Sequence, residues 1–126
     1  GLSLTSQPLR VLRPAMAAQG VTTCADYARL PDGSRARVAG LVITRQRPAT
    51  ASGILFATLE DETGIANVVV RVREQKRHRA EALEARLMVV DGKVERRGEV
   101  VHLVASRLMD ATEFVRDVPT RSRDFR

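Results

Sequence analysis

The feature that most constrains the fold is a continuous stretch of strand-forming sequence between residues 35 and 72. Three runs of β-branched and aliphatic residues follow one another there, and short segments containing Gly, Pro, Thr and Asp separate them. Gly accepts positive φ without a Cβ clash, which suits these segments to tight turns. We therefore predict three consecutive strands, at residues 38–45, 54–60 and 65–72, joined as a meander.

The alternation of side chains along these strands predicts two faces. Successive strand residues point to opposite sides of a sheet, so residues two apart share a face. The apolar set, which we expect to face the core, comprises Leu55, Ala57, Leu59, Ala66, Val68, Val70 and Val72. The opposite side collects one aromatic ring, two hydrogen-bonding groups and a cation, namely Phe56, Thr58, Asn67 and Arg71. This second side is the candidate binding surface.

The sequence before the meander predicts helices. Apolar residues recur near helical spacing at Leu9, Leu12, Met16 and Ala17. A helix is therefore expected over residues 2–19, with Gly20 as its C-terminal cap and with Pro14 breaking or kinking it. A second, short helix is expected from residue 22 or 23 to about residue 30, where a Pro-Asp-Gly turn follows. Asp26 is placed as in a capping box for that helix.

The sequence after the meander predicts a helix followed by a hairpin. Residues 73–87 combine good helix formers with leucines four apart, which favours one amphipathic helix. Residues 87–96 and 99–109 carry alternating apolar residues around an Arg-Gly turn, so we expect a hairpin. His102 lies in the second strand of that hairpin and is interpreted as an ordinary sheet residue. Periodicity is lost from residue 111 onward, where a basic tail is expected.

Composition and motif content exclude several classes of function. No apolar run approaches the ~18 residues of a membrane span, and no signal peptide is visible. The single cysteine, Cys24, allows no internal disulfide and is interpreted as a buried structural thiol in a cytoplasmic protein. The sequence shows no nucleophile motif, phosphate-binding loop or metal-ligand spacing, so we predict no catalytic residue, metal or cofactor. Glu60, Asp61 and Glu62 are interpreted as a solvated turn.

The segment 56–69, FATLEDETGIANVV, resembles the second-to-third strand region of OB-fold nucleic-acid-binding domains. It is similar to the anticodon-binding domains of class II aminoacyl-tRNA synthetases and to the OB domain of C-family bacterial DNA polymerases. Segments 38–56 and 121–126 look like the error-prone branch of those polymerases, relatives of the polymerase III alpha subunit. Residues 1–9 resemble the linker that precedes their OB domain.

This resemblance covers essentially the whole chain and implies an all-β fold. The expected architecture is a five-stranded OB barrel with a helix between strands three and four and a helical segment before the barrel. The expected organisation is a helical linker or docking segment (1–34), an OB-fold domain (35–110) and a basic tail (111–126). The resemblance also implies that the chain is the C-terminal piece of a much larger enzyme.

The resemblance gives individual residues candidate roles. Phe56 matches the phenylalanine with which similar tRNA-binding domains stack an anticodon base, and Asn67 matches their base-contacting amide. Arg45 and Arg47 border the loop between strands one and two, which helps grip the ligand in OB folds. The chain departs from the error-prone polymerases after strand three, where Arg71 and the residues following it replace aromatic side chains.

The charge and these residues together predict binding of nucleic acid. The formal net charge of +6 favours a polyanionic partner. Single-stranded DNA is held by stacking bases on aromatic rings and by cations along its backbone, so we predict single-stranded template DNA as the ligand. The resemblance implies that the parent catalyses DNA-directed nucleotidyl transfer during lesion bypass and damage-induced mutagenesis. It also implies accessory mutagenesis proteins, and through them the sliding clamp, as partners.

Two alternative functions remain open at the level of sequence. OB folds also serve as docking surfaces, so the domain is alternatively a protein–protein docking module that recruits accessory mutagenesis factors. The likeness to anticodon-binding domains leaves an RNA-binding or tRNA-binding function as the other alternative. The loop at residues 45–53 and the ending at 121–126 favour the polymerase interpretation over RNA binding.

Overall fold

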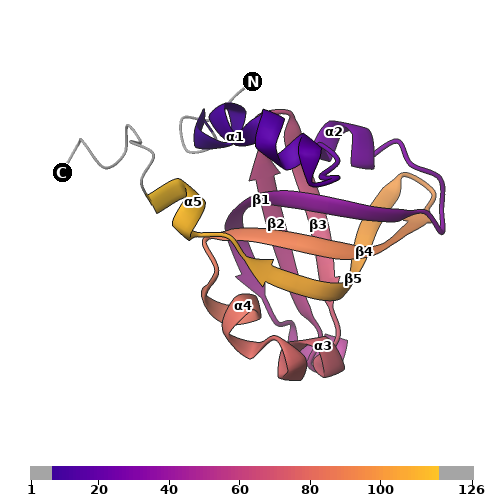
Figure 1. The fold of residues 1–126 in the computed structure, drawn as a ribbon. Coiled ribbons are helices and arrows are strands. Elements are labelled where there is room, and N and C mark those ends of the chain that lie inside the picture. The colour runs from indigo at the N-terminus through magenta and orange to yellow at the C-terminus, as the bar shows by residue number, and fades with distance from the viewer. Residues whose placement is uncertain (1–6, 117–126) are drawn as a thin grey trace.

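The computed structural model describes residues 7–116, which form a closed five-stranded barrel with helices at both of its ends (Figure 1). The strands are β1 (Arg35–Gln46), β2 (Leu55–Asp61), β3 (Gly64–Val70), β4 (Leu87–Arg97) and β5 (Val100–Asp110). Neighbours pair in the order β1-β2-β3-β5-β4, and every pairing is antiparallel except that of β3 with β5. The predicted barrel, with its helical connection between the third and fourth strands, is confirmed.

Alternate residues of β2 and β3 point into one hydrophobic core. The burial patterns of these two strands alternate as predicted. The inward-facing residues, each at most 3% exposed, are Leu55, Ala57, Leu59, Ala66, Val68 and Val70. The prediction that Val72 joins them is wrong, because this residue begins the next helix and is 40% exposed.

Two glycines let neighbouring strands approach more closely than a side chain would permit. A Cβ on Gly92 would lie 2.4 Å from the carbonyl oxygen of Val104, and one on Gly40 would lie 2.8 Å from the Cβ of Leu59. The register between β4 and β5 also shifts between Asp91 and Gly92. Bulges and glycines of this kind bend a strand, and that bending lets five strands close into a barrel.

Helix α1 (Gln7–Ala18) lies across one end of the barrel (Figure 1). Its apolar residues pack with residues of β4 and α5 (Glu113–Arg116) into a second, smaller core. This core contains Leu9, Leu12, Met16, Leu87 and Val115. Ala17, predicted to share the packed side, is exposed. Pro14 lies inside the helix and does not end it, and Gly20 follows with a φ of +80°, as suits a C-terminal cap.

Helix α2 (Cys24–Tyr27) is the short second helix predicted from the sequence, although it ends before Leu30. The Thr23 hydroxyl accepts a hydrogen bond from the backbone N–H of Asp26 at 3.0 Å, which caps the first turn. Cys24 is 1% exposed, so the expected burial of its thiol is confirmed. Burial is also the main reason why the pKa of Cys24 is raised.

The predicted single helix over residues 73–87 is two helices, α3 (Val72–Arg77) and α4 (Arg79–Glu84). His78 separates them, with backbone angles of −129° and 51° that lie outside the helical region. Both helices close the barrel end opposite α1 and α2 (Figure 1). The β1–β2 loop contributes a single 3₁₀ turn, η2 (Ala49–Ala51).

The interpretation of the β2–β3 turn as a solvated acidic loop is wrong for Asp61, which is 2% exposed. Its carboxylate accepts hydrogen bonds from the backbone N–H of Cys24 at 2.9 Å and from Arg13 Nη2 at 3.0 Å. It also accepts from the backbone and the hydroxyl of Thr63. Arg13 donates in addition to both carboxylate oxygens of Glu62. The turn therefore attaches α1 and α2 to the barrel.

The part of the chain after β5 is only partly covered by the structure. Residues 113–116 form the short helix α5, in a region where the sequence predicted no periodic element. The rest of the predicted basic tail, 117–126, and the start of the predicted first helix, 2–6, lie outside the described residues. Between residues 7 and 116, no helix has the length and apolar character needed to cross a membrane.

Candidate nucleic-acid interface

The outer face of the β2–β3 hairpin brings four of the six predicted site residues together. Thr58 of β2 lies opposite Asn67 of β3, and Phe56 lies opposite Val69. Phe56 and Thr58 are half-buried, whereas Asn67 is exposed. Arg71 follows β3 directly, and its side chain is 56% exposed. The face thus presents a ring for stacking, two polar groups for hydrogen bonding and one cation.

His102 extends this face to a third strand. The rings of Phe56 and His102 lie 6.3 Å apart between centroids and are tilted by 57°, a favourable geometry for an aromatic pair. The contact depends on the parallel pairing of β3 with β5, in which Val69 lies opposite Val104. The sequence pattern predicted that His102 is an ordinary sheet residue and did not predict its contact with Phe56. The pattern of one strand does not show which distant strands lie near it in the barrel.

The two ends of the face carry opposite charge. Glu60 lies opposite Ile65 near the turn, and Glu62 lies in the turn itself. Arg71 lies at the other end, the end closer to Phe56. The buried carboxylate of Glu74 lies 3.3 Å from Arg71 Nε, which leaves the rest of that guanidinium toward solvent. A polyanion is therefore attracted to the Phe56 end by Arg71, whereas the carboxylate of Glu62 at the turn end is already paired with Arg13.

Gln75 of α3 connects the β1–β2 loop to the end of β3. Its Nε2 donates to the carbonyl oxygens of Gly53 and Val70, at 2.8 and 2.9 Å. Its Oε1 accepts a hydrogen bond from Arg47 Nη2 at 2.6 Å. The predicted site residue Arg47 is thereby held beside α3, near the cationic end of the face. The sequence did not predict that Gln75 connects these two segments, because a polar residue on a helix is usually exposed to solvent.

Arg45 is placed apart from the other predicted residues. Its Nε and Nη2 donate to the carbonyl oxygens of Ala82 and Ala85, at 2.7 and 2.6 Å, at the C-terminal end of α4. Burial lowers the pKa of this guanidinium. A cation in this position satisfies carbonyl groups that the helix leaves without intrahelical partners. The structure therefore shows Arg45 positioning α4 beneath the β1–β2 loop.

Tyr27 supports the face from inside the molecule. It is 2% exposed, and its hydroxyl donates to the carbonyl oxygen of Val101 at 3.1 Å. The same hydroxyl lies 3.5 Å from the carbonyl oxygen of Asn67. Burial raises the pKa of Tyr27 to about 12, so the hydroxyl keeps its proton at neutral pH. One side chain from α2 thus connects the backbones of β3 and β5 behind the exposed residues.

The chemistry of this face is that of binding. Residues 7–116 contain no group of three or more His, Cys, Asp or Glu side chains placed to hold a metal ion. Aromatic, amide and guanidinium groups supply stacking, base-edge hydrogen bonds and phosphate contacts respectively. The arrangement suits a nucleic acid whose bases are unpaired.

A comparison of sequences assigns the family. The sequence profile of the OB-fold nucleic acid binding domain matches residues 36–111, from the second residue of β1 to the first residue after β5. The chain belongs to this OB-fold family. The chain is 51% identical over 125 residues to the error-prone DNA polymerase of Azoarcus sp.. It is 48% identical over 125 residues to the error-prone DNA polymerase of Pseudomonas aeruginosa.

The extent of these matches differs between the chain and its relatives. Each alignment covers 99% of the chain but 12% of the polymerase. Among solved structures, asparaginyl-tRNA synthetase from Pyrococcus horikoshii has a TM-score of 0.58 and 24% identity, over 72% of this chain and 23% of the synthetase. The hypothetical protein ygiW from E. coli has a TM-score of 0.56 and 15% identity, over 72% and 89%. Both likenesses concern the fold.

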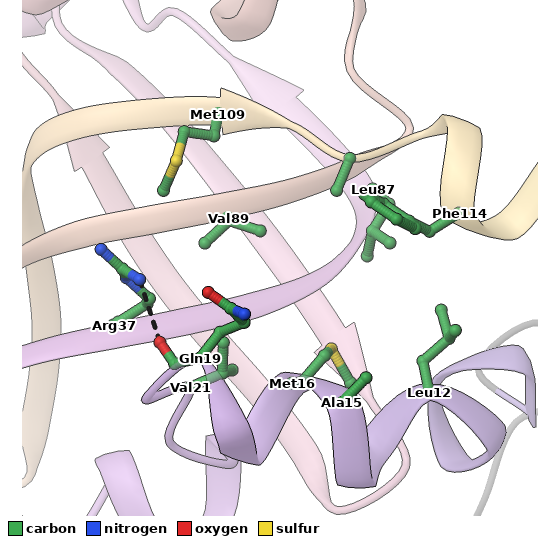
Figure 2. A pocket seen from close by; sticks show the side chains of 11 residues that line it. Leu12, Ala15, Met16, Gln19, Val21, Arg37, Leu87, Val89, Met109 and Phe114 are labelled. Atoms are coloured by element: carbon green, nitrogen blue, oxygen red, sulfur yellow. Dashed lines mark hydrogen bonds between the residues drawn. The ribbon is translucent and has the colours of Figure 1, made fainter.

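The described residues carry a second surface feature, an apolar groove between α1 and the outer side of β4 and β5 (Figure 2). Figure 2 shows Leu12 and Met16 of α1 facing Val89 and Met109 across it, with Phe114 of α5 near one end. The groove holds about 350 Å³, and Phe114 is 57% exposed. Exposed apolar surface of this kind is typical of contacts with other protein segments.

Proposed function

We propose that the OB-fold domain binds single-stranded template DNA across the outer face of β2 and β3. The observation that carries this proposal is the half-buried ring of Phe56 on that outer face, at its cationic end. One base stacks on Phe56, an interaction worth about 1–3 kcal/mol. Thr58 and Asn67 provide hydrogen bonds to base edges, and Arg47 and Arg71 contact phosphates. Arg45 acts indirectly, by positioning α4.

The proposal for the whole protein rests on the error-prone DNA polymerase relatives. They are much longer than this chain, which matches 12% of each, and in this proposal the catalytic activity belongs to segments outside it. In this proposal the OB-fold domain (35–110) lies in the C-terminal part of a cytoplasmic polymerase related to the polymerase III alpha subunit. A helical segment (1–34) precedes the domain and a basic tail (111–126) follows it. The parent then copies damaged template DNA during induced mutagenesis.

Fluorescence anisotropy with labelled oligo-dT and a matched RNA, at two salt concentrations, tests the binding proposal. Phe56→Ala should raise the Kd for oligo-dT about 5-fold to 140-fold, because it removes a stacking interaction of about 1–3 kcal/mol. If four phosphates are neutralised, log K against log salt should have a slope of about −3 for the unmodified chain. The proposal expects oligo-dT to bind at least as tightly as RNA.

Two control variants make the result specific. Phe56→Tyr keeps an aromatic ring and should retain affinity. Val11→Ala truncates an apolar residue that is 69% exposed on α1, away from the β2–β3 face, and should leave binding unchanged. Equal Kd values for Phe56→Ala and the unmodified chain would remove the stacking role. A clearly lower Kd for RNA than for oligo-dT would instead support the RNA-binding alternative.

A second candidate function, protein docking, is favoured by the apolar groove. We propose that the groove receives an apolar segment from the rest of the polymerase polypeptide. The alignments cover 12% of each polymerase relative, so the remaining 88% of each polymerase lies outside the aligned region. The first and last described helices, α1 and α5, both border the groove (Figure 2). Accessory mutagenesis proteins, and through them the sliding clamp, are the other proposed partners of the parent.

Methionine oxidation footprinting compares the groove in this chain and in the full-length polymerase. Met16 and Met109 line the groove and are half-buried, whereas Met88 is 0% exposed in the barrel core and serves as the internal control. Docking predicts that both groove methionines oxidise more slowly in the full-length protein, with Met88 unchanged. Equal rates in the two proteins would contradict intramolecular docking. Protection that requires an added accessory protein would assign the groove to that partner.

A further inference from the structure

A basic hollow lies beside the cationic end of the proposed DNA face, between the β1–β2 loop and helices α3 and α4. We call it the α3–α4 hollow; its volume is about 340 Å³. Its lining residues are Arg47, Gly53, Val72, Gln75, Lys76, Arg79 and Leu83. Three of these side chains are cationic, and no carboxylate belongs to the lining. Glu74 is 3% exposed, and its carboxylate lies near Arg71 and Arg73.

The lining of the α3–α4 hollow combines the two kinds of group that a nucleotide contacts. Lys76 and Arg79 are exposed and offer cations to a phosphodiester. Val72 and Leu83 are 40% and 38% exposed, which is a large exposure for apolar residues, and they provide an apolar surface for a sugar or base. The sequence pattern favoured solvation of the basic run 71–79, since helix charges usually face water. In the structure, Arg47 of the β1–β2 loop lies beside Lys76 and Arg79 in the lining of the hollow.

The hollow lies at the end of the face that carries Phe56, where Gln75 of its lining donates a hydrogen bond to the carbonyl oxygen of Val70. Phe56 lies opposite Gln46 on one side and Val69 on the other. The chain continues from Gln46 to Arg47, and from Val69 through Arg71 to α3, so both neighbouring strands lead to the hollow. Figure 1 shows α3 at the end of the barrel where β3 finishes.

We propose that the α3–α4 hollow is a second nucleotide subsite, which holds the phosphodiester and sugar of a nucleotide beyond the one stacked on Phe56. This proposal rests on the proposed single-stranded DNA function and deepens it. It assigns Lys76 and Arg79 to phosphate contact, Arg47 to a position between the two subsites, and Val72 and Leu83 to the apolar contact. A strand long enough to reach from Phe56 across α3 engages both subsites.

Anisotropy titrations with two lengths of oligo-dT, about 4 and about 12 nucleotides, test the second subsite, since single OB folds cover about 4–16 nucleotides. The test variant is Lys76→Ala/Arg79→Ala. The matched control is Arg35→Ala/Arg107→Ala, which removes two exposed cations from the opposite region of the barrel, on β1 and β5. Both variants lower the formal net charge from +6 by two, to +4, so non-specific attraction is equal.

If the second subsite exists, Lys76→Ala/Arg79→Ala should lose more affinity for the longer oligonucleotide than for the shorter one. With two phosphate contacts removed, the salt slope for the 12-mer should become shallower by about 1.4, and the Kd at about 0.1 M salt should rise about 25-fold. Binding of the 4-mer, which is stacked on Phe56, should weaken much less. The control variant should bind both oligonucleotides with the Kd values of the unmodified chain. If the test variant binds the 12-mer with an unchanged Kd and salt slope, the second subsite is overturned. The proposed function would still stand in that case if Phe56→Ala weakens oligo-dT binding. No binding of either oligonucleotide by the unmodified chain would reject both.

Discussion

At the scale of single residues, Asp61 joins three parts of the molecule. Its carboxylate receives hydrogen bonds from α1 through Arg13, from the first residue of α2 and from its own turn. Buried carboxylates require such partners, because an unpaired charge in the interior is costly. The site face and this anchor share one hairpin: Phe56, Thr58 and Glu60 point outward, whereas Asp61 continues the inward series.

Asp61→Ala is expected to destabilise the chain by about 3–5 kcal/mol, because the buried N–H of Cys24 and the partly buried N–H groups of the turn lose their acceptor, and Arg13 loses one of its two carboxylate partners. Urea unfolding at neutral pH measures the loss. Asp26→Ala is the matched control, since it removes a 61%-exposed carboxylate that pairs with Arg29, and its cost should stay below about 1 kcal/mol. Similar costs for the two variants would show that Asp61 behaves as the solvated turn residue that the sequence pattern favoured.

The residue scale also shows what sequence reasoning could and could not predict. Side-chain alternation placed Phe56, Thr58 and Asn67 on the outer face correctly, because strand parity is a local property. The same reasoning had no means to find Arg13, which lies 48 positions from Asp61, or to pair His102 with Phe56. These contacts arise from closure of the barrel and from docking of α1.

At the scale of elements, the connection between β3 and β4 differs most from its prediction. Helix formers over residues 73–87 favoured one continuous helix, but a straight helix would leave the barrel end open. The break at His78 lets α4 turn back beneath the barrel, where the guanidinium of Arg45 binds the carbonyl oxygens of Ala82 and Ala85. Tertiary packing has overridden propensity here.

Arg45 and Arg47 are therefore expected to behave differently when replaced. Arg45→Ala should lower the free energy of unfolding by about 1.5–3 kcal/mol, because hydrogen bonds from a charged donor are lost. Arg47→Ala removes an exposed side chain and should cost less than about 1 kcal/mol in stability while weakening DNA binding. Urea unfolding and oligo-dT titration of both variants test this distinction. A large affinity loss in Arg45→Ala without destabilisation would assign Arg45 to direct phosphate contact.

At the scale of the whole molecule, the barrel was predictable from sequence, whereas the attachment of its helices was not. Alternation and glycine turns are local patterns, which explains why strand bounds agreed with their predictions to within a few residues, and the resemblance to OB-fold domains supplied the barrel. The helices attach through individual ion pairs and hydrogen bonds, such as those of Arg13 and Tyr27. Such contacts leave no periodic pattern in the chain.

This mode of attachment predicts acid sensitivity. For Asp61 burial alone would raise the pKa, but hydrogen bonds from Thr63 and Cys24 outweigh it, so the pKa lies below its ordinary value of 3.8. The hydrogen bond from Arg13 is the main reason why the pKa of Glu62 lies below 4.5. A lowered carboxyl pKa gives stability that is complete above the ordinary pKa and is lost as pH falls through the lowered one.

Unfolding free energy should therefore decline as the pH falls from about 5 toward 2. Urea unfolding across this range measures the decline. The variant Asp61→Asn/Glu62→Gln should show a shallower dependence, because its amides do not titrate there. Parallel curves for the variant and the unmodified chain would assign the acid sensitivity to other carboxyl groups.

The strict in-and-out alternation of β2 has a consequence for how such a domain can diversify. Substitutions at positions 56, 58 and 67 alter the proposed binding surface, while the inward neighbours that close the barrel are untouched. Selection can therefore change the outer face without first compensating a loss of stability. A lineage with this hairpin can vary that face one outward side chain at a time.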